Sequence, residues 1–291
     1  MRIALFDECR VGIVVGTTIH DVTEVIDERW RGTPYATTDL IERWDVLQGP
    51  LEDALGRAQQ RALADVRLLA PLPRPRQLLA APANYHAHVE EMSGSRFAPS
   101  NAQALQSPRE AGFFVKAAGS ISGPADPIEL PDLPGRTFHH EVELGLVIGK
   151  AARAVARQDA HRHIFGYVCV LDITLRVDGE HQEGRTLRKS FETFTPLGPV
   201  IVTADEIPDD EDVDLRLWVN DELRQEANTR DLLVGVDELL ERASRVVTLH
   251  PGDVYATGTP DGVGPIVPGD TVRAVVGGVG ELTLPVVQRG W

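Results

Sequence analysis

Two glutamates two positions apart lie inside an apolar run, where they are candidates for binding a cation. The run reads His139-His140-Glu141-Val142-Glu143-Leu144-Gly145-Leu146-Val147-Ile148-Gly149. Side chains two apart on an extended strand point to the same side, so Glu141 and Glu143 project together. Residues 144–148 do not alternate with polar ones, which is typical of a strand buried on both faces. Because an unpaired buried charge is costly, a cation is the favoured partner. The alternative is an edge strand with an acidic outer face.

A third carboxylate has a similar setting. The β-branched and aromatic run at 165–171 ends in Asp172, which we also expect to be buried. Three carboxylates form a hard oxygen site suited to Mg²⁺, Mn²⁺ or Ca²⁺ and poorly suited to zinc. His139 shares the parity of Glu141 and Glu143, so an iron site with one nitrogen ligand stays open as an alternative.

Other polar residues could carry chemistry near such a site. His88 and Glu91 are three apart, so on a helix they are neighbours and could form a water-activating pair. His86 and Glu90 lie close by, so an ordinary surface helix is the alternative. Lys189 lies near Phe191 and Phe194 in the sequence, which suggests a partly buried cation able to bind an oxyanion. An exposed lysine is the alternative. The loop 257–264 contains glycines that would let backbone amides approach a ligand, or it is simply a tight turn.

The elements that position these residues are mainly short strands. Beyond the acid-bearing strands, strand patterns occur at 77–81, 113–116, 200–203, 215–219, 254–256, 272–276 and 281–287. Helical spacing occurs at 38–47, 51–64, 84–92 and 237–249, with Asn84 as a candidate N-cap. Strands with scattered helices predict a strand-rich α+β architecture. The proline-rich run at 71–75 predicts a division into a small N-terminal α/β domain, 1–72, and a catalytic domain, 73–291.

Composition narrows the range of partners. The chain has 291 residues, 42% of them hydrophobic, and a net charge of −15. This charge argues against nucleic acid or an anionic membrane as the main partner, so we expect a small molecule. The two cysteines, Cys9 and Cys169, form no disulfide framework. Asp7 and Glu8 interrupt the N-terminal apolar stretch, so no signal peptide is indicated and we expect a cytoplasmic protein.

Taken together, these segments resemble the fumarylacetoacetate hydrolase (FAH) family over about residues 75–288. The order and number of the motifs make the resemblance specific to the family. The motifs that carry it are Asn84-Tyr85-His86-Ala87-His88-Val89-Glu90-Glu91, Phe114-Val115-Lys116 with Ser120, Glu141-Val142-Glu143-Leu144, Phe165-Gly166-Tyr167 through Asp172, Lys189-Ser190-Phe191, Leu197-Gly198-Pro199, Leu217-Trp218-Val219-Asn220, and Pro251-Gly252-Asp253 with Thr257-Gly258-Thr259-Pro260.

The resemblance implies a mixed β-sandwich roll, usually a homodimer, with a divalent metal. It also implies roles for individual residues. Glu141, Glu143 and Asp172 would bind Mg²⁺ or a similar ion, His88 would be the water-activating base, Glu91 would orient His88, Lys189 and Thr259 would bind substrate oxygens, and Arg176 would contact the substrate.

Two departures from the family pattern concern substrate identity. The stretch 174–181 differs from the commoner pattern after the arginine, and Arg188 stands where glycine is frequent. Both fall near the expected rim of the pocket, so they bear on the ligand and leave the metal site untouched.

These features lead us to expect a metal-dependent hydrolase that cleaves a carbon–carbon bond in an acylpyruvate-like β-dicarbonyl acid. The nearest alternative is a decarboxylase, tautomerase, isomerase or hydratase that acts on a 2-keto acid such as oxaloacetate or a hydroxymuconate-type diacid. A non-catalytic protein with a structural calcium site belongs to a different class and is the third option. We also expect residues 93–110, a long stretch rich in small residues after the base, to become ordered when ligand binds.

Overall fold

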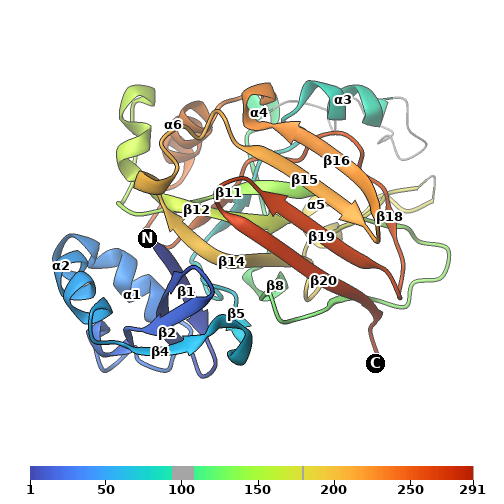
Figure 1. The fold of residues 1–291 in the computed structure, drawn as a ribbon. Coiled ribbons are helices and arrows are strands. Elements are labelled where there is room, and N and C mark those ends of the chain that lie inside the picture. The colour runs from blue at the N-terminus through green and yellow to red at the C-terminus, as the bar shows by residue number, and fades with distance from the viewer. Residues whose placement is uncertain (94–107, 179, 291) are drawn as a thin grey trace.

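A large mixed sheet forms the centre of the computed structural model, which describes residues 1–93, 108–178 and 180–290 (Figure 1). Its strand order is β4-β3-β2-β1-β14-β12-β11-β17-β6-β7, with β5 paired to β1 and β8 paired to β14. The bounds are β1 Arg2–Phe6, β2 Arg10–Val15, β3 Thr18–Asp21, β4 Gln59–Ala62, β5 Leu68–Leu69, β6 Leu78–Ala80, β7 Phe114–Val115, β8 Ile121–Ser122, β11 Val142–Ile148, β12 Ile164–Leu171, β14 Thr195–Thr203 and β17 Val254–Ala256.

Two smaller sheets complete the β structure. A five-stranded sheet has the order β16-β15-β19-β20-β9, and a three-stranded sheet has the order β13-β10-β18. Their bounds are β9 Ile128–Leu130, β10 Phe138–His139, β13 Thr174–Leu175, β15 Asp214–Val219, β16 Glu222–Asn228, β18 Pro265–Ile266, β19 Thr271–Val276 and β20 Gly280–Gln288.

Helices are short and lie around the sheets. Two of them, α1 and α2, lie beside the N-terminal strands, and α3 and α6 lie above the five-stranded sheet in the view of Figure 1. The α-helices are α1 Ala36–Glu42, α2 Trp44–Leu55, α3 His86–Ser93, α4 Pro108–Ala111, α5 Arg185–Arg188 and α6 Val236–Val246, and the longest 3₁₀ segment is η5 Arg157–His163.

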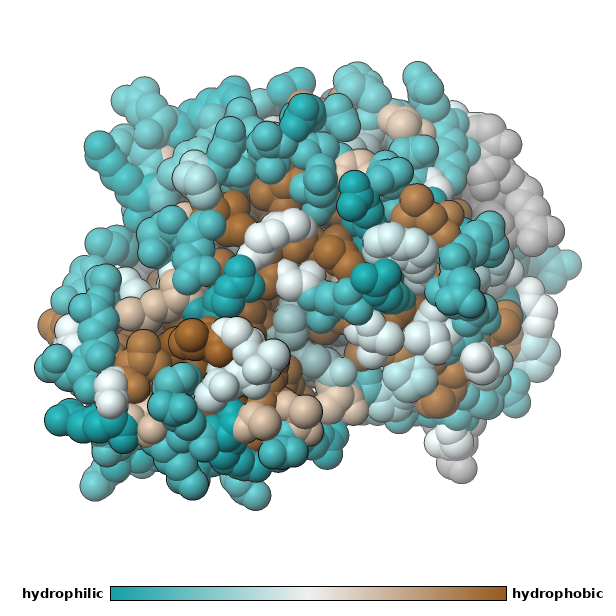
Figure 2. Space-filling model, in the orientation of Figure 1, coloured by the Kyte–Doolittle hydropathy of each residue, from teal (hydrophilic) through white to brown (hydrophobic). Residues whose placement is uncertain are grey.

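The strand β11 separates two hydrophobic cores. Every one of its residues is buried, which confirms a strand covered on both faces. Leu144 and Leu146 contribute to a core shared with the five-stranded sheet, whereas Val147 contributes to a second core shared with α1 and α2. Figure 2 shows the outer face over the five-stranded sheet mostly covered by hydrophilic residues, with hydrophobic ones visible mainly toward the middle. The packing of two sheets with peripheral helices confirms the strand-rich α+β class.

Two expectations about local structure were wrong. The helix expected over 51–64 ends at Leu55, because Gln59–Ala62 instead pairs with β3 and sheet hydrogen bonds outweigh a weak local preference for helix. Asn84 is not a helix cap, since α3 begins at His86. Its buried side chain donates to the carbonyls of Val234 and Thr257 and so ties two later segments together.

The N-terminal strands are not a separate sheet. Strand β1 pairs antiparallel with β14, with Ile3 opposite Ile201, so the first residues extend the large sheet. The proposed division into domains at 72/73 stays a prediction.

Residues 94–107, most of the stretch expected to order on ligand binding, lie outside the described residues. Within the described ranges, no helix combines the length and apolar content needed to cross a bilayer.

Candidate active site

The three predicted carboxylates meet in one buried cluster. One oxygen from each of Glu141, Glu143 and Asp172 lies within 4.8 Å of the others. Glu143 belongs to β11, Glu141 directly precedes β11, and Asp172 directly follows β12. These strands run antiparallel with Val142 opposite Leu171, which brings the start of one strand beside the end of the other. The exposure of the three residues is 4%, 1% and 1%. This burial excludes the alternative of an edge strand whose acidic face points to solvent.

Two buried lysines neutralise part of this cluster. The ammonium of Lys189 donates to Glu141 Oε2 at 2.7 Å, Asp172 Oδ2 at 2.5 Å and Thr174 Oγ1 at 2.7 Å. Lys116 donates to Asp172 Oδ1 at 2.5 Å. Lys189 is 6% exposed, so the exposed-lysine alternative is excluded.

The pKa values of the two glutamates move in opposite directions because their partners differ. Burial acts on both, but Lys189 and Arg176 outweigh it at Glu141 and hold that pKa below its usual range. Burial and the nearby charge of Asp172 raise the pKa of Glu143 to about 8. Among the described residues, the hydrogen bond that Glu143 accepts is from the backbone N–H of Gly258, at 2.7 Å. Glu143 is therefore the one carboxylate of the three that forms no ion pair within the described residues.

The three clustered carboxylates fit a hard divalent ion. Three carboxylate oxygens within reach of one cation match the preference of Mg²⁺, Mn²⁺ and Ca²⁺ for oxygen ligands, and the raised pKa of Glu143 is the mark of acids crowded without enough positive charge. His139 is not part of the cluster. It lines a second cavity, of about 590 Å³, which holds none of the three carboxylates. The mixed nitrogen and oxygen iron site was therefore wrong.

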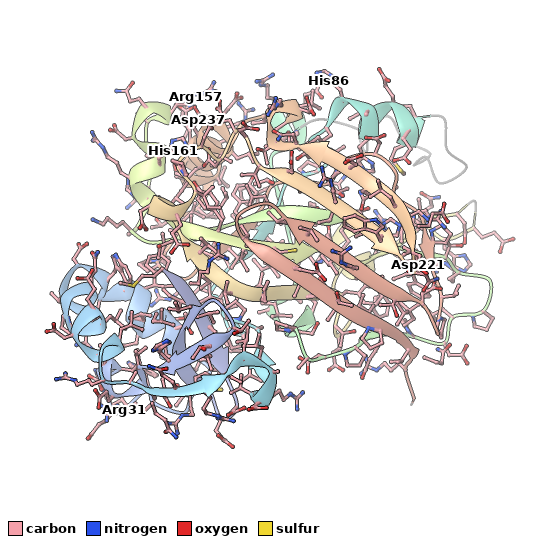
Figure 3. All side chains as sticks on the ribbon, in the orientation of Figure 1. Arg31, His86, Arg157, His161, Asp221 and Asp237 are labelled. Carbon is pink, nitrogen blue, oxygen red and sulfur yellow. The ribbon has the colours of Figure 1, made fainter. Side chains whose placement is uncertain are left out.

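The predicted His88 and Glu91 pair forms on α3. His88 Nδ1 lies 3.2 Å from Glu91 Oε2, and the other oxygen of Glu91 accepts from the backbone N–H of Gly262 at 3.1 Å. His88 is buried and lines the same cavity as the three carboxylates. His86, on the same helix, is exposed and lies at the outer surface (Figure 3). The helix thus presents one histidine to the cavity and one to solvent.

The two predicted substrate-contacting residues also line this cavity. Arg176 donates from Nη2 to Glu141 Oε1 at 2.6 Å, while its buried Nε has no hydrogen-bond partner among the described residues. Thr259 Oγ1 accepts from Gln225 Nε2 at 2.9 Å, which leaves the hydroxyl hydrogen of Thr259 available to a ligand.

Sequence reasoning assigned no role to Lys116, although the residue was within one of the quoted motifs. It is 1% exposed, and burial lowers its pKa while Asp172 opposes that effect. A lysine directly after a short apolar strand carries a weak signal at most, because its partner Asp172 is distant in sequence. Arg185 and Arg188 also line the cavity, and only Arg188 had drawn attention, as a departure from the family pattern.

Comparisons with known proteins show the family to which the chain belongs. The family model for the C-terminal region of fumarylacetoacetate (FAA) hydrolase matches residues 77–287. The chain is 40% identical over 289 residues to maleylpyruvate hydrolase of Aquipseudomonas alcaligenes, covering 98% of this chain and 99% of that protein. It is 36% identical over 233 residues to the mitochondrial oxaloacetate tautomerase of Xenopus laevis, covering 77% and 69%.

A solved structure resembles the whole chain. The crystal structure of maleylpyruvate hydrolase from Sphingobium sp. SYK-6, in complex with manganese (II) ion and pyruvate, has a TM-score of 0.86 and 43% sequence identity. The match covers all of both chains. This likeness confirms the expected fold.

Proposed function

Because the chain belongs to the fumarylacetoacetate hydrolase family, we propose that it is a divalent-metal-dependent hydrolase that cleaves a carbon–carbon bond in an acylpyruvate-like β-dicarbonyl acid. The observation that carries this proposal is one cavity lined by three clustered carboxylates, the histidine of a His–Glu pair, and a buried lysine. The similarity to two maleylpyruvate hydrolases supports it.

The metal site would be formed by Glu141, Glu143 and Asp172, with Mg²⁺, Mn²⁺ or Ca²⁺ as the candidate ions. When bound, such an ion supplies positive charge for the 2-keto (or enol) oxygen and the adjacent carboxylate of the substrate. Lys189, held by two of these carboxylates, is placed to stabilise negative charge that develops on the substrate. Thr259 would donate its hydroxyl hydrogen to a carboxylate oxygen, and Arg176 has a nitrogen left for the same ligand.

His88 is proposed as the general base. Glu91 accepts a hydrogen bond from Nδ1 in the tautomer that leaves Nε2 free to take a proton from water. The hydroxide oxygen would bond to the distal carbonyl carbon, and the electron pair of the breaking carbon–carbon bond would pass to the pyruvate enolate. Return of the proton that His88 took from water to the enolate carbon would give pyruvate beside the released carboxylic acid.

Turnover of acetylpyruvate with Mg²⁺ or Mn²⁺ tests this proposal, with two histidines of one helix as a matched pair. His88→Ala should lower kcat by about 10²- to 10⁴-fold, the usual contribution of general acid–base catalysis, and leave metal affinity nearly unchanged. His86→Ala, which changes an exposed side chain, should behave as the unaltered enzyme. Equal activity in both variants would exclude His88 as the base.

A second candidate function uses the same site without attack by water. The similarity to an oxaloacetate tautomerase favours tautomerisation of a 2-keto acid, and decarboxylation, isomerisation or hydration belong to the same group of reactions. Product analysis with oxaloacetate beside acylpyruvates separates the two functions. Oxaloacetate activity that survives His88→Ala, with no acylpyruvate cleavage by the intact enzyme, would favour this second function.

Three further features stay predictions. We propose a small-molecule 2-keto acid or β-dicarbonyl substrate, a homodimer and a cytoplasmic location. The net charge of −15 supports a small ligand over nucleic acid. The resemblance to the family supports the homodimer, and light scattering of the purified protein would test it.

A further inference from the structure

We propose that Gln225 is a positioning residue that makes the hydroxyl of Thr259 a hydrogen-bond donor to the substrate. The Gln225 amide would do so by donating to the hydroxyl oxygen, while His140 holds the amide in place. This inference rests on the proposed function, in which Thr259 binds a substrate oxygen, and adds the group that sets the direction of that hydrogen bond.

Gln225 is a buried polar residue on a largely exposed strand. Strand β16 forms one edge of the five-stranded sheet (Figure 1). Gln225 is 0% exposed, whereas its neighbours Arg224 and Glu226 are exposed. Burial of an amide is costly unless both its oxygen and its NH₂ group are hydrogen-bonded. The partners of the amide are therefore the place to look for a role of this side chain.

Backbone groups at both ends of the amide fix its orientation. Gln225 Oε1 accepts from the backbone N–H of Val142 at 3.1 Å, and Gln225 Nε2 donates to the backbone carbonyl of Pro260 at 2.9 Å. A backbone N–H only donates and a carbonyl oxygen only accepts, so a flipped amide would place like groups together at both ends. The NH₂ group of Gln225 therefore faces the loop 257–264.

His140 supports this orientation from the oxygen side. His140 Nδ1 lies 3.1 Å from Gln225 Oε1, and because this oxygen is an acceptor, Nδ1 carries the hydrogen. His140 is 0% exposed, and its backbone N–H donates to the carbonyl of Gly264 at 3.2 Å. Two donors thus converge on one oxygen, and together they restrict rotation of the amide.

The orientation of the amide decides what the Thr259 hydroxyl can do. Gln225 Nε2 donates to Thr259 Oγ1 at 2.9 Å, so the hydroxyl is an acceptor on that side and its hydrogen is left for another partner. Thr259 lines the cavity that holds the three carboxylates. The hydroxyl hydrogen is therefore directed to a ligand in the cavity. An acceptor in place of the NH₂ group would draw that hydrogen away from the ligand.

The competing explanation is that Gln225 only fastens the loop 257–264 to the sheet. The same loop holds Glu91, since the backbone N–H of Gly262 donates to Glu91 Oε1 at 3.1 Å. A displaced loop would disturb Glu91, and through it His88, so kcat would fall. Loss of the Thr259 hydrogen bond would instead weaken substrate binding and raise KM. The division of an effect between kcat and KM therefore separates the two explanations.

A double-mutant cycle tests whether Gln225 acts through the hydroxyl. Oxalate serves as the probe, and calorimetry on the Mn²⁺-loaded protein measures its binding. Thr259→Val should weaken oxalate binding by about 10- to 100-fold, the range of a hydrogen bond to a charged group. Gln225→Met should weaken it by about tenfold, near the upper range of a neutral hydrogen bond. Added to Thr259→Val, Gln225→Met should have an effect of less than about twofold, whereas added to Thr259→Ser it should keep its full effect.

Two further variants guard against a general loss of structure. Gln225→Glu keeps an oxygen toward Val142 and replaces the NH₂ group by an acceptor, so it tests the same coupling if Gln225→Met is unstable. Its effect on oxalate binding should also be smaller in Thr259→Val than in Thr259→Ser. Glu226→Gln changes the next residue of β16, which is exposed, and should bind oxalate as the unaltered protein does.

The outcomes separate this inference from the proposed hydrolysis. A Gln225→Met effect of equal size in all backgrounds would overturn the proposal, as would unchanged oxalate binding in either single variant. With acetylpyruvate, a higher KM at nearly constant kcat in Gln225→Met would support it, and a lower kcat at constant KM would overturn it in favour of fastening. Failure to cleave any acylpyruvate would count against the hydrolase alone, because the oxalate cycle needs no turnover.

Discussion

Binding of a divalent ion to the carboxylate cluster is predicted to release a proton from Glu143, so metal affinity should rise with pH up to about 8. A neutral carboxylic acid must ionise before it acts as a metal ligand, and Glu143 has a pKa of about 8. At pH 6 only about one Glu143 side chain in a hundred would be ionised. The dissociation constant for Mn²⁺ should therefore be about 100-fold larger at pH 6 than well above pH 8. This factor corresponds to about 2.7 kcal/mol. Calorimetric titration with MnCl₂, repeated in buffers of different ionisation enthalpy, gives both the affinity and the number of protons released.

Two variants sharpen this measurement. Glu143→Gln removes the titrating ligand, so it should bind Mn²⁺ more weakly and lose this contribution to the pH dependence. Glu52→Gln changes an exposed glutamate and should match the unaltered protein. An affinity that is the same at pH 6 and pH 8, with no proton released, would refute the assignment of Glu143 as a cation-deficient ligand.

Three more perturbations have outcomes set by the structure. Lys116→Met removes a buried cation bonded to Asp172, so the metal-free protein should lose about 3 kcal/mol of unfolding free energy; urea unfolding measures this, and a change under about 1 kcal/mol would contradict it. Gly166→Ala would place a methyl group 2.1 Å from the carbonyl oxygen of Val202 on the paired strand, so overpacking should cost about 3 kcal/mol, seen as a lower Tm; an unchanged Tm would show that the strands adjust freely. Metal at 100 times its Kd should raise the unfolding free energy by about 2.7 kcal/mol over protein in chelator, and equal Tm values in the two conditions would argue against a specific metal site.

The metal cluster was predictable because its signal is local. The sequence places Glu141 and Glu143 two positions apart and follows them with a continuous apolar run, and Asp172 ends another apolar run. These patterns fix which faces the side chains occupy. Pairing of the two strands then brings the acids together.

Residues whose roles depend on distant partners were harder to predict. Lys116 meets Asp172 and the carbonyl of Phe194, and Asn84 bonds segments more than 140 positions away. Neither contact follows from spacing or periodicity, because both need the finished packing of sheets. The prediction of a helix at 59–62 was wrong for the same reason. This segment pairs with β3, and the neighbouring strand decides that pairing, not the composition of the segment itself.

The continuity of β1 with β14 has a consequence for any shortened form of the chain. A protein that began after the proline-rich run at 71–75 would lack β1, whose hydrogen bonds cover Ile201 and Val202. The exposed backbone amides and carbonyls would then be a template for adding a strand from another molecule. Deleting residues 1–75 should therefore promote aggregation even if every group around the acid cluster is kept.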